Sequence, residues 1–375
     1  MAAPSHAVSP LTSEHAKRHR LLQQLHRRGQ ASRLRLAREL RISNSRVCDL
    51  VDKMVDEGLL DEDSSIGERR GRRGVTIRLN PRYGHFVGFD MEAKRLRIVL
   101  TDFTGHVVWE SRRALRPPKD QAAFLVQIFD FVDASMTEVR TRSRRVLGFG
   151  VAASGVIDRK RGVILHYDLV PQATNLPVRD LIAERVGVPC FMENNIRAMT
   201  LAEWTLGAAR GLKTFVCMSV RSGVGAGVVI DGRMHTGTHG FAGETGYMVL
   251  PDAGPCADWK NLQQTVSETG LGIDVEASGF DIPEPVARRT GEVIASQLAS
   301  IAAVIDPEAF VLGGIMLKPD GPVWPHVQRA FKETALREVA EHVPLLAAQL
   351  GPFAAAQGAA YRCLYELFPV SHAVD

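Results

Sequence analysis

The sequence lacks the features that mark membrane-bound, secreted and disulfide-rich proteins. No apolar run is long enough to cross a bilayer. Residues 1–10 do not show the charged-then-apolar order of a secretory signal. The 5 cysteines are scattered and odd in number, which fits reduced thiols better than a disulfide framework. We therefore expect a cytoplasmic protein without a membrane partner.

The net charge of +4 is small, but it is unevenly distributed along the chain. Residues 1–80 hold 16 of the 46 Lys and Arg side chains and 10 of the 42 acidic ones, a balance of +6, which leaves −2 for the remaining 295 residues. A basic excess at one end is expected where that end binds phosphates, although a solvated basic tail would give the same balance. Because 375 residues exceed the size of a single hydrophobic core, we expect two or three domains.

The basic segment has the pattern of three short helices. Residues 1–13 are small, polar and proline-containing and are expected to be a disordered lead, and an amphipathic helix runs from Glu14 to a stop at Gly29. Ser32 and Ser43 are each placed to cap a following helix. Two short helices with a tight connection form a helix-turn-helix, whose second helix presents its first turn to base edges in the major groove.

A β-hairpin is predicted directly after the third helix. Leu59 and Leu60 precede a polar stretch and an arginine- and glycine-rich tip, and residues 75–79 alternate as a return strand. Arginines at such a tip suit a phosphate clamp or insertion into a narrow minor groove. A small helical domain with a flexible basic loop is the alternative, but the hairpin and the charge asymmetry favour a winged helix-turn-helix over residues 14–80. The residues predicted to contact double-stranded DNA are Ser43, Asn44, Ser45 and Arg46 in the helix and Arg69, Arg70, Arg72 and Arg73 in the wing.

From Tyr83 onwards the sequence alternates predicted strands and helices. Strands are expected at residues 85–89, 96–101, 106–109, 146–151 and 190–192, with an amphipathic helix at 121–139. A helix at 197–207, a glycine-rich hairpin at 215–230, a long helix at 284–305 and a strand at 309–312 continue the pattern. This alternation indicates an α/β architecture with mixed sheets.

Four stretches of this segment resemble the ROK family of repressors and sugar kinases, and they occur in the family's order. They are residues 150–158, residues 193–195 with 201–203, residues 223–227 with 240–247, and residues 306–308 with 311–314. The resemblance covers nearly all of residues 14–370. It implies a two-lobed actin-like, hexokinase-like (ribonuclease H-like) ATPase-type domain at 81–375, with lobe 1 at about 81–195 plus the C-terminal helix and lobe 2 at about 196–349. It also implies a homodimer or homotetramer.

The stretches that a ROK sugar kinase needs for catalysis are altered. The family's kinases begin with Asp-x-Gly-Gly-Thr, whose glycines let the backbone approach the phosphates. Residues 90–94 read Asp-Met-Glu-Ala-Lys here, so Met91 and Glu92 are expected to occupy phosphate space. The second phosphate contact, usually Gly-Thr-Gly, reads Arg-Ser-Gly at 221–223. The family's catalytic aspartate falls at Asn195, and an amide cannot serve as a general base. We therefore expect no catalytic residue and no kinase activity.

The zinc site of the family is altered as well. That site uses the histidine of Glu-x-Gly-His and three cysteines, whereas here Tyr247 replaces the histidine and Cys256 stands alone. Because one thiolate cannot make a closed tetrahedral site, neither a structural metal nor a cofactor is expected.

Several positions that surround the sugar in the family keep short polar side chains. Each sugar hydroxyl needs a donor or acceptor as it leaves water, so such a set suits a polyhydroxylated ligand. Asn194 or Asn195 could instead only cap the helix that follows. The resemblance assigns ligand binding to Ser154, Gly155, Asn175, Asn194, Asn195, Glu244 and Tyr247.

Together these patterns predict a transcriptional regulator of the bacterial nucleoid, with repression as the expected output. It would bind a pseudo-palindromic operator as a symmetric oligomer and sense a sugar or sugar derivative in an inactive kinase-like domain. Two alternatives stay open. One is an active sugar kinase with an accessory DNA-binding domain, and the other is a regulator whose kinase-like domain is only a scaffold controlled by a protein partner.

Overall fold

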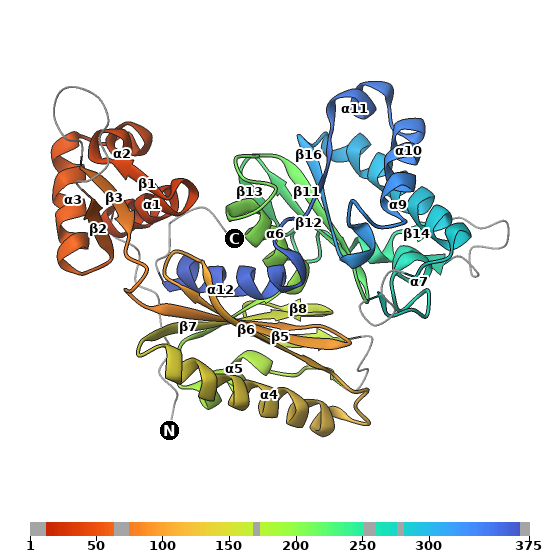
Figure 1. The fold of residues 1–375 in the computed structure, drawn as a ribbon, viewed down its shortest axis with the longest axis horizontal. Helices are drawn as coiled ribbons and strands as arrows, with labels where there is room; N and C mark the ends of the chain where they lie inside the picture. Colours follow the sequence, from red (N-terminus) through yellow and green to blue (C-terminus); the bar gives the residue numbers. More distant parts are fainter. Residues whose placement is uncertain (1–12, 64–74, 168–172, 251–259, 276–280, 368–375) are drawn as a thin grey trace.

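A computed structural model describes residues 13–63, 75–167, 173–250, 260–275 and 281–367 (Figure 1). The predicted lead, apart from Ser13, lies outside these ranges, and so do Cys256 and the four wing arginines at 69, 70, 72 and 73. Among the helices within the described ranges, none combines the length and the apolar character that spanning a membrane requires.

The basic N-terminal segment folds into three helices and three short strands. The hydroxyls of Ser32 and Ser43 accept hydrogen bonds from the backbone amides of Arg35 and Arg46, so both predicted helix caps are present. A short strand that the sequence did not predict, β1, pairs with the return strand of the wing and ties it to the end of the first helix. The elements are α1 (Ser13–Arg28), β1 (Gln30–Ser32), α2 (Arg33–Leu40), α3 (Asn44–Asp56), β2 (Leu60–Asp63) and β3 (Thr76–Leu79).

Lobe 1 is built around a five-stranded sheet in the order β10-β7-β4-β5-β6. Helices cover both faces, with α4 and α5 on one side and α12 on the other, which is why the central strands are almost continuously apolar (Figure 1). A two-stranded sheet of β8 and β9 lies beside it. The elements are β4 (His85–Met91), β5 (Arg95–Asp102), β6 (Val107–Ala114), α4 (Gln121–Arg142), β7 (Val146–Ala153), β8 (Val156–Asp158), β9 (Val163–His166), α5 (Val178–Val186), β10 (Cys190–Asn194) and α12 (Ala354–Leu367).

Lobe 2 repeats this arrangement with the order β13-β12-β11-β16-β17. In both sheets the first two pairings, from β6 or β13 inwards, are antiparallel and the next two are parallel. Two lobes of matching topology are the architecture that the resemblance implies. The elements are β11 (Phe215–Val220), β12 (Val224–Ile230), β13 (Arg233–His235), η1 (Thr245–Tyr247), β14 (Val249–Leu250), β15 (Lys260–Asn261), α7 (Leu262–Val266), α9 (Glu284–Ile305), β16 (Ala309–Gly313), η3 (Ile315–Leu317), α10 (Trp324–Thr334), α11 (Arg337–His342), β17 (Leu345–Ala347) and η4 (Gly351–Phe353).

Two helices, α6 (Asn195–Thr205) and α12, lie between the sheets and pack against each other (Figure 1). Their backbones touch at Gly358, where a Cβ atom would stand 1.7 Å from the carbonyl oxygen of Ala198. At Gly150 a Cβ would stand 1.9 Å from the carbonyl oxygen of Ala359, so α12 also rests directly on β7. Because only glycine permits such approaches, any side chain at Gly358 or Gly150 would push the two helices or the sheet apart.

The N-terminal segment packs against lobe 1 through aromatic rings. His19 and His26 on α1 are buried, and their rings lie 5.4 Å and 5.1 Å from those of Tyr365 and Tyr361 on α12. Leu21, Leu22 and Leu25 of α1 belong to the same apolar cluster as Phe103 and the C-terminal residues Tyr361 and Leu364 of α12. The helix-turn-helix and the C-terminal helix therefore share one continuous core.

Candidate functional site

A cavity of about 380 Å³ lies between the two lobes at the beginning of α6. Its volume falls within the range of small-molecule sites, which is roughly 300–1,000 Å³. Lobe 1 contributes the ends of β7 and β10, and lobe 2 contributes the segments around η1 and α7. The structure places six of the seven predicted ligand residues around it, namely Ser154, Gly155, Asn194, Asn195, Glu244 and Tyr247.

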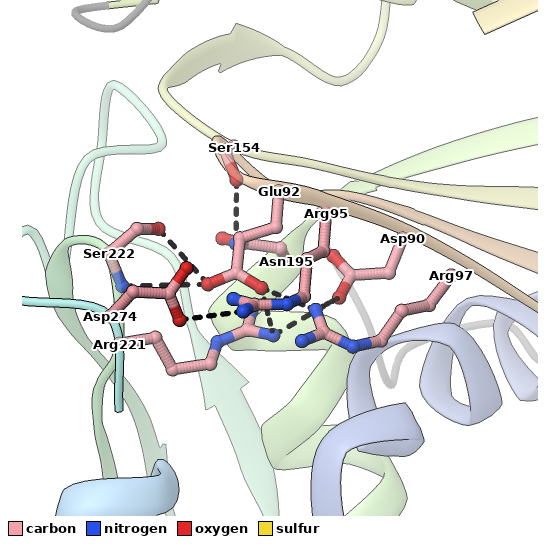
Figure 2. Close-up of polar contacts among 9 residues, drawn as sticks. All are labelled: Asp90, Glu92, Arg95, Arg97, Ser154, Asn195, Arg221, Ser222 and Asp274. Carbon is pink, nitrogen blue, oxygen red and sulfur yellow. Dashed lines mark hydrogen bonds and ion pairs between the residues drawn. The ribbon is translucent and has the colours of Figure 1, made fainter. Parts of the chain in front are cut away.

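On the lobe 1 side, the two asparagines have different roles. The side-chain oxygen of Asn194 accepts hydrogen bonds from the backbone amides of Ile196 and Arg197, so Asn194 caps α6 as one sequence hypothesis held. Asn195 donates from Nδ2 to Ser154 Oγ at 2.8 Å. Asn195 and Ser154 thus form one polar pair at the cavity wall (Figure 2).

On the lobe 2 side, Glu244 and Tyr247 line the cavity together with Gln263 and Gln264 of α7. The Tyr247 side chain is half-exposed and contributes an aromatic residue to the cavity lining. A sugar ring exposes C–H faces that pack on aromatic rings and hydroxyl edges that need polar partners, and the cavity supplies both.

Asn175 does not line this cavity. It is exposed and has a φ of +53°, and it directly precedes Leu176, which is buried and pairs with Ile164 through the backbone. The resemblance assigned Asn175 to the ligand-binding set, but the structure places it outside the lining of this cavity.

Of the two residues that replace the family's phosphate-binding glycines, Met91 and Glu92, only Glu92 lies between the lobes. Met91 is buried in the hydrophobic core of lobe 1, so the expectation that it would occupy phosphate space is wrong. Side chains in a strand alternate between its two faces, and β4 turns Met91 towards α4. Glu92 follows on the opposite face and reaches the boundary between the lobes.

Glu92 belongs to a buried ionic cluster that joins the lobes (Figure 2). In lobe 1, Arg97 contacts Glu92 and lies 3.7 Å from Asp90. From lobe 2, Nη1 of Arg221 lies 3.1 Å from Asp90 Oδ2 and 3.4 Å from Glu92 Oε2. The Ser222 hydroxyl donates to Glu92 Oε1 at 3.0 Å. Each carboxylate therefore has guanidinium partners from both lobes.

The two carboxylates respond differently to this environment. Burial raises the pKa of Asp90, with the charge of nearby Glu92 adding to the effect. Burial alone would also raise the pKa of Glu92, but Arg221 and Arg97 outweigh it and hold the value at about 2. Glu92 is consequently ionised at neutral pH and is the principal counter-charge of the two guanidiniums.

Two further contacts beside the cluster cross the lobe boundary. Arg95 pairs with Asp274 at 2.6 Å, and Lys94 Nζ donates to the carbonyl oxygen of Ile273 at 2.7 Å. A second cavity of about 260 Å³ opens behind the cluster, with Glu92 and Arg221 forming the partition from the first. Its other charged lining residues are Arg95, Arg97, Arg112, Glu268 and Lys318.

Arg97 and Gln263 are site residues that the sequence reasoning missed. Arg97 is a buried charged residue near the start of β5, followed by the apolar run Ile98–Leu100, and a buried arginine in such a place requires an acidic partner. That pattern could have found it. Gln263 has no comparable signal, because it follows a stretch without predicted structure.

In the helix-turn-helix, the described DNA-contact candidates occupy the first turn of α3 and its cap. Asn44, Ser45 and Arg46 are exposed, while the hydroxyl of Ser43 is used for capping. The exposed face of α3 therefore offers an amide, a hydroxyl and a guanidinium, which are the groups that read base edges.

Comparison with known proteins gives a consistent result. The model of the ROK family matches residues 86–364. The xylose repressor of Caldicellulosiruptor bescii is 27% identical over 245 residues, which are 64% of this chain and 61% of that protein. The chain thus spans less than two thirds of that relative's length. The DNA-binding transcriptional dual regulator NagC of Escherichia coli K12 is 23% identical over 353 residues, 86% of each protein.

A solved structure extends the similarity to the whole described fold. A ROK family transcriptional regulator, a homologue of the E. coli MLC protein, superposes with a TM-score of 0.77 at 20% identity. The match covers 94% of this chain and 97% of that one. At this identity it supports the shared fold, including the N-terminal segment.

Proposed function

The chain belongs to the ROK family, and we propose that it is a DNA-binding transcriptional repressor whose kinase-like domain senses a sugar or sugar derivative and catalyses nothing. The observation that carries the proposal is the combination of two sites in one chain. A cavity lined by Ser154, Asn195 and Glu244 lies at the start of α6, and the N-terminal segment carries a helix, α3, whose first turn is exposed.

The absence of catalysis follows from two side chains. Asn195 stands at the cavity wall where the family's catalytic aspartate falls, and its amide cannot accept the proton of a sugar hydroxyl. Glu92 places an ionised carboxylate between the two cavities, where it would repel a nucleotide phosphate. Restoring one of these residues would leave the other defect in place.

DNA recognition is assigned to α3 and to the wing. Asn44, Ser45 and Arg46 would enter the major groove, and Arg69, Arg70, Arg72 and Arg73 would contact phosphates or the minor groove. The name of NagC, a DNA-binding transcriptional dual regulator that aligns over 86% of this chain, supports DNA binding as such. Two copies in a dimer or tetramer would bind half-sites about one helical turn or a multiple apart.

The structure offers a direct physical connection between the two sites. The cavity is bordered by Asn195, the first residue of α6, and α6 contacts α12 through the backbone at Gly358. Further along α12, Tyr361 and Tyr365 contact the histidines of α1 in the helix-turn-helix. A ligand that prefers one arrangement of the lobes would shift α6 against α12 and so move the DNA-binding segment, with a coupling of about 1–3 kcal/mol.

Operator selection from random duplex DNA, followed by titration of a sugar panel against the selected duplex, tests this function. We expect a pseudo-palindrome and at least one sugar that changes its affinity about 5- to 150-fold. A palindrome that no sugar affects would leave DNA binding but favour a scaffold controlled by a partner. Failure to select any sequence would contradict the assignment of α3.

The kinase alternative is tested separately by sugar-dependent consumption of ATP with the same panel. We expect no turnover above the background of a matched preparation without sugar. Sugar-dependent turnover that is abolished by Asn195→Ala would overturn the assignment of an inactive domain.

A further inference from the structure

The carboxylate of Glu92 is bound by a set of donor groups that in other proteins binds a free anion. It contacts the guanidinium groups of Arg97 and Arg221, and Oε1 accepts hydrogen bonds from the Ser222 hydroxyl at 3.0 Å and the Ser222 backbone amide at 3.5 Å. Two guanidiniums, a hydroxyl and a backbone amide in a turn are the donors of many phosphate and sulfate sites. Figure 2 shows these donors converging on one carboxylate from both lobes.

We propose that Arg97, Arg221 and Ser222 form an anion-binding site that the chain occupies with its own Glu92. In this arrangement Glu92 has two effects. It fills the site, so no phosphate group can enter, and it fastens lobe 1 to lobe 2 without any bound ligand.

The burial of the cluster explains why the site needs an anion. The side chains of Arg97 and Arg221 are 2% and 11% exposed, and Asp90 beside them is fully buried. Guanidinium groups at such depth are costly without a counter-charge. Because burial favours the protonated form of Asp90, the ionised Glu92 is the anion on which the two arginines depend.

The site also has unused donor capacity. Nη2 of Arg221 is buried and has no hydrogen-bond partner among the described residues. A tetrahedral oxyanion brings more acceptor oxygens than a carboxylate and could use this N–H group. Removing the side chain of Glu92 would open the site to both cavities, since Glu92 and Arg221 line each of them.

A consequence for the ligand rests on the proposed function. Glu92 lines the first cavity, and its carboxylate already neutralises the guanidinium groups of Arg97 and Arg221. A phosphate group on a sugar bound there would therefore be repelled by Glu92 and would find no free cation in this pair. We therefore infer that the effector is an uncharged sugar and that Glu92 selects against its phosphorylated form. This consequence can fail while the anion site itself is present.

The test is the melting temperature of the full chain with inorganic phosphate or sulfate at millimolar concentrations, against chloride of equal ionic strength. The native protein should change by less than about 1 °C. The variant Glu92→Ala should melt at a lower temperature in chloride and recover by about 5 °C in phosphate, as expected for a ligand at about 100 times its dissociation constant. The control is Glu268→Ala. Glu268 lines the same second cavity, and it bonds to Arg221 through its backbone amide, which donates to the Arg221 carbonyl oxygen at 2.9 Å, a bond that alanine keeps.

The responses of the two variants to phosphate distinguish a specific site from a general salt effect. Stabilisation of Glu92→Ala by phosphate beyond that of Glu268→Ala supports the site, and equal responses of the two variants would overturn it. If Glu92→Ala does not fold in chloride, purification in phosphate and the variant Glu92→Gln provide the same comparison by calorimetric titration. Glu92→Gln should bind phosphate more weakly than Glu92→Ala, because its amide still fills the site. None of these measurements requires DNA or sugar, so they are independent of the proposed function.

Discussion

The imidazole ring of His26 in α1 meets the ring of Tyr361 in α12 edge to face, with the centroids 5.1 Å apart and the planes at 90°. His26 also lies 6.3 Å from the ring of Phe103, so three rings from two domains meet in one place. A T-shaped aromatic pair adds about 0.5–1.5 kcal/mol to the burial of the rings. Because the C-terminal helix also packs against α6, the His26–Tyr361 pair is where movement in the kinase-like domain would reach the DNA-binding segment.

Replacing Tyr361 should separate DNA binding from ligand sensing. Tyr361→Ala removes the ring that packs against His26, and we expect the effect of the inducing sugar on operator affinity to fall towards onefold. The affinity of the sugar itself should change little, because Tyr361 does not line the cavity. Titration of the selected operator with and without sugar measures this coupling.

A core substitution far from the His26–Tyr361 pair controls for general loss of stability. Phe331, buried in α10 of lobe 2, can be changed to Leu. That variant should lose stability and keep the coupling. If Phe331→Leu and Tyr361→Ala reduce the coupling equally, the ring pair has no special role in transmission.

The two buried histidines predict that stability declines in mild acid. Burial lowers the pKa of His26 to about 3 and that of His19 to about 4, against 6.5 for an exposed imidazole. The unfolded chain therefore binds protons that the folded chain does not. The stability from the neutral rings is complete above pH 6.5 and is lost as the pH falls towards 4, by about 1.4 kcal/mol per pH unit for each histidine.

Denaturant unfolding at several pH values checks this decline. His26→Phe keeps a ring against Tyr361. The slope of the free energy of unfolding against pH should decrease between pH 6 and 5 by about 1.4 kcal/mol per pH unit, which corresponds to about one proton. Phe331→Leu removes no titratable group and should leave the slope as it is in the native protein. An unchanged slope in His26→Phe would mean that His26 titrates normally and is therefore not buried in solution.

The buried ionic cluster predicts a large loss of stability when one cation is removed. Arg97→Met keeps the length of the side chain but leaves Glu92 without its lobe 1 partner, which should cost about 3–5 kcal/mol. Arg185→Met removes an exposed ion pair with Asp133 and should cost far less, because solvent screens such a pair. Chemical denaturation of both variants measures the difference. Similar losses would indicate that water enters the cluster.

The polar pair at the cavity wall predicts the effect of substitutions on ligand affinity. Asn195→Ala removes the donor to Ser154 and a group available to a sugar hydroxyl, which should weaken binding by about 1–3 kcal/mol. Asn175→Ala is the matched control, since that asparagine is exposed and outside the lining. Calorimetric titration with the inducing sugar compares them. A larger loss from Asn175→Ala would place the ligand elsewhere.

The four wing arginines predict a salt-dependent contribution to DNA binding. Changing Arg69, Arg70, Arg72 and Arg73 together to Ala should weaken binding to all sequences, and the slope of log affinity against log salt should become shallower by about 0.9 for each phosphate that is no longer neutralised. Asn44→Ala or Arg46→Ala should instead relax the sequence preference. Unaltered affinity in the fourfold variant would remove the wing from the interface, and a uniform loss in Arg46→Ala would assign Arg46 to a phosphate.

Local features of the fold were predictable from the sequence because they depend on residues a few positions apart. Ser32 and Ser43 cap α2 and α3 as predicted, since a hydroxyl reaches the amide three residues on. The long helix was expected at 284–305 and is found at Glu284–Ile305, because its apolar residues recur with the helical period. The motifs also indicated the cavity, because the family's spacing brings 154, 194–195 and 244–247 to one place.

What only the tertiary structure decided depends on which strands and helices become neighbours. Asp90 and Arg221 are 131 positions apart and form an ion pair because the lobes close on each other. Met91 lies in the core while Glu92 reaches the lobe boundary, an orientation set by the helix on one side of the sheet and the opposite lobe on the other. His26 and Tyr361 meet because α1 packs on α12, while Gly358 and Gly150 let α12 lie close to α6 and β7. Caps and periodicity act over single turns, whereas burial of a charge or a ring depends on the whole surrounding fold. The sequence therefore determined most of the helices and strands, and the tertiary structure determined the short strand β1 and the contacts between elements.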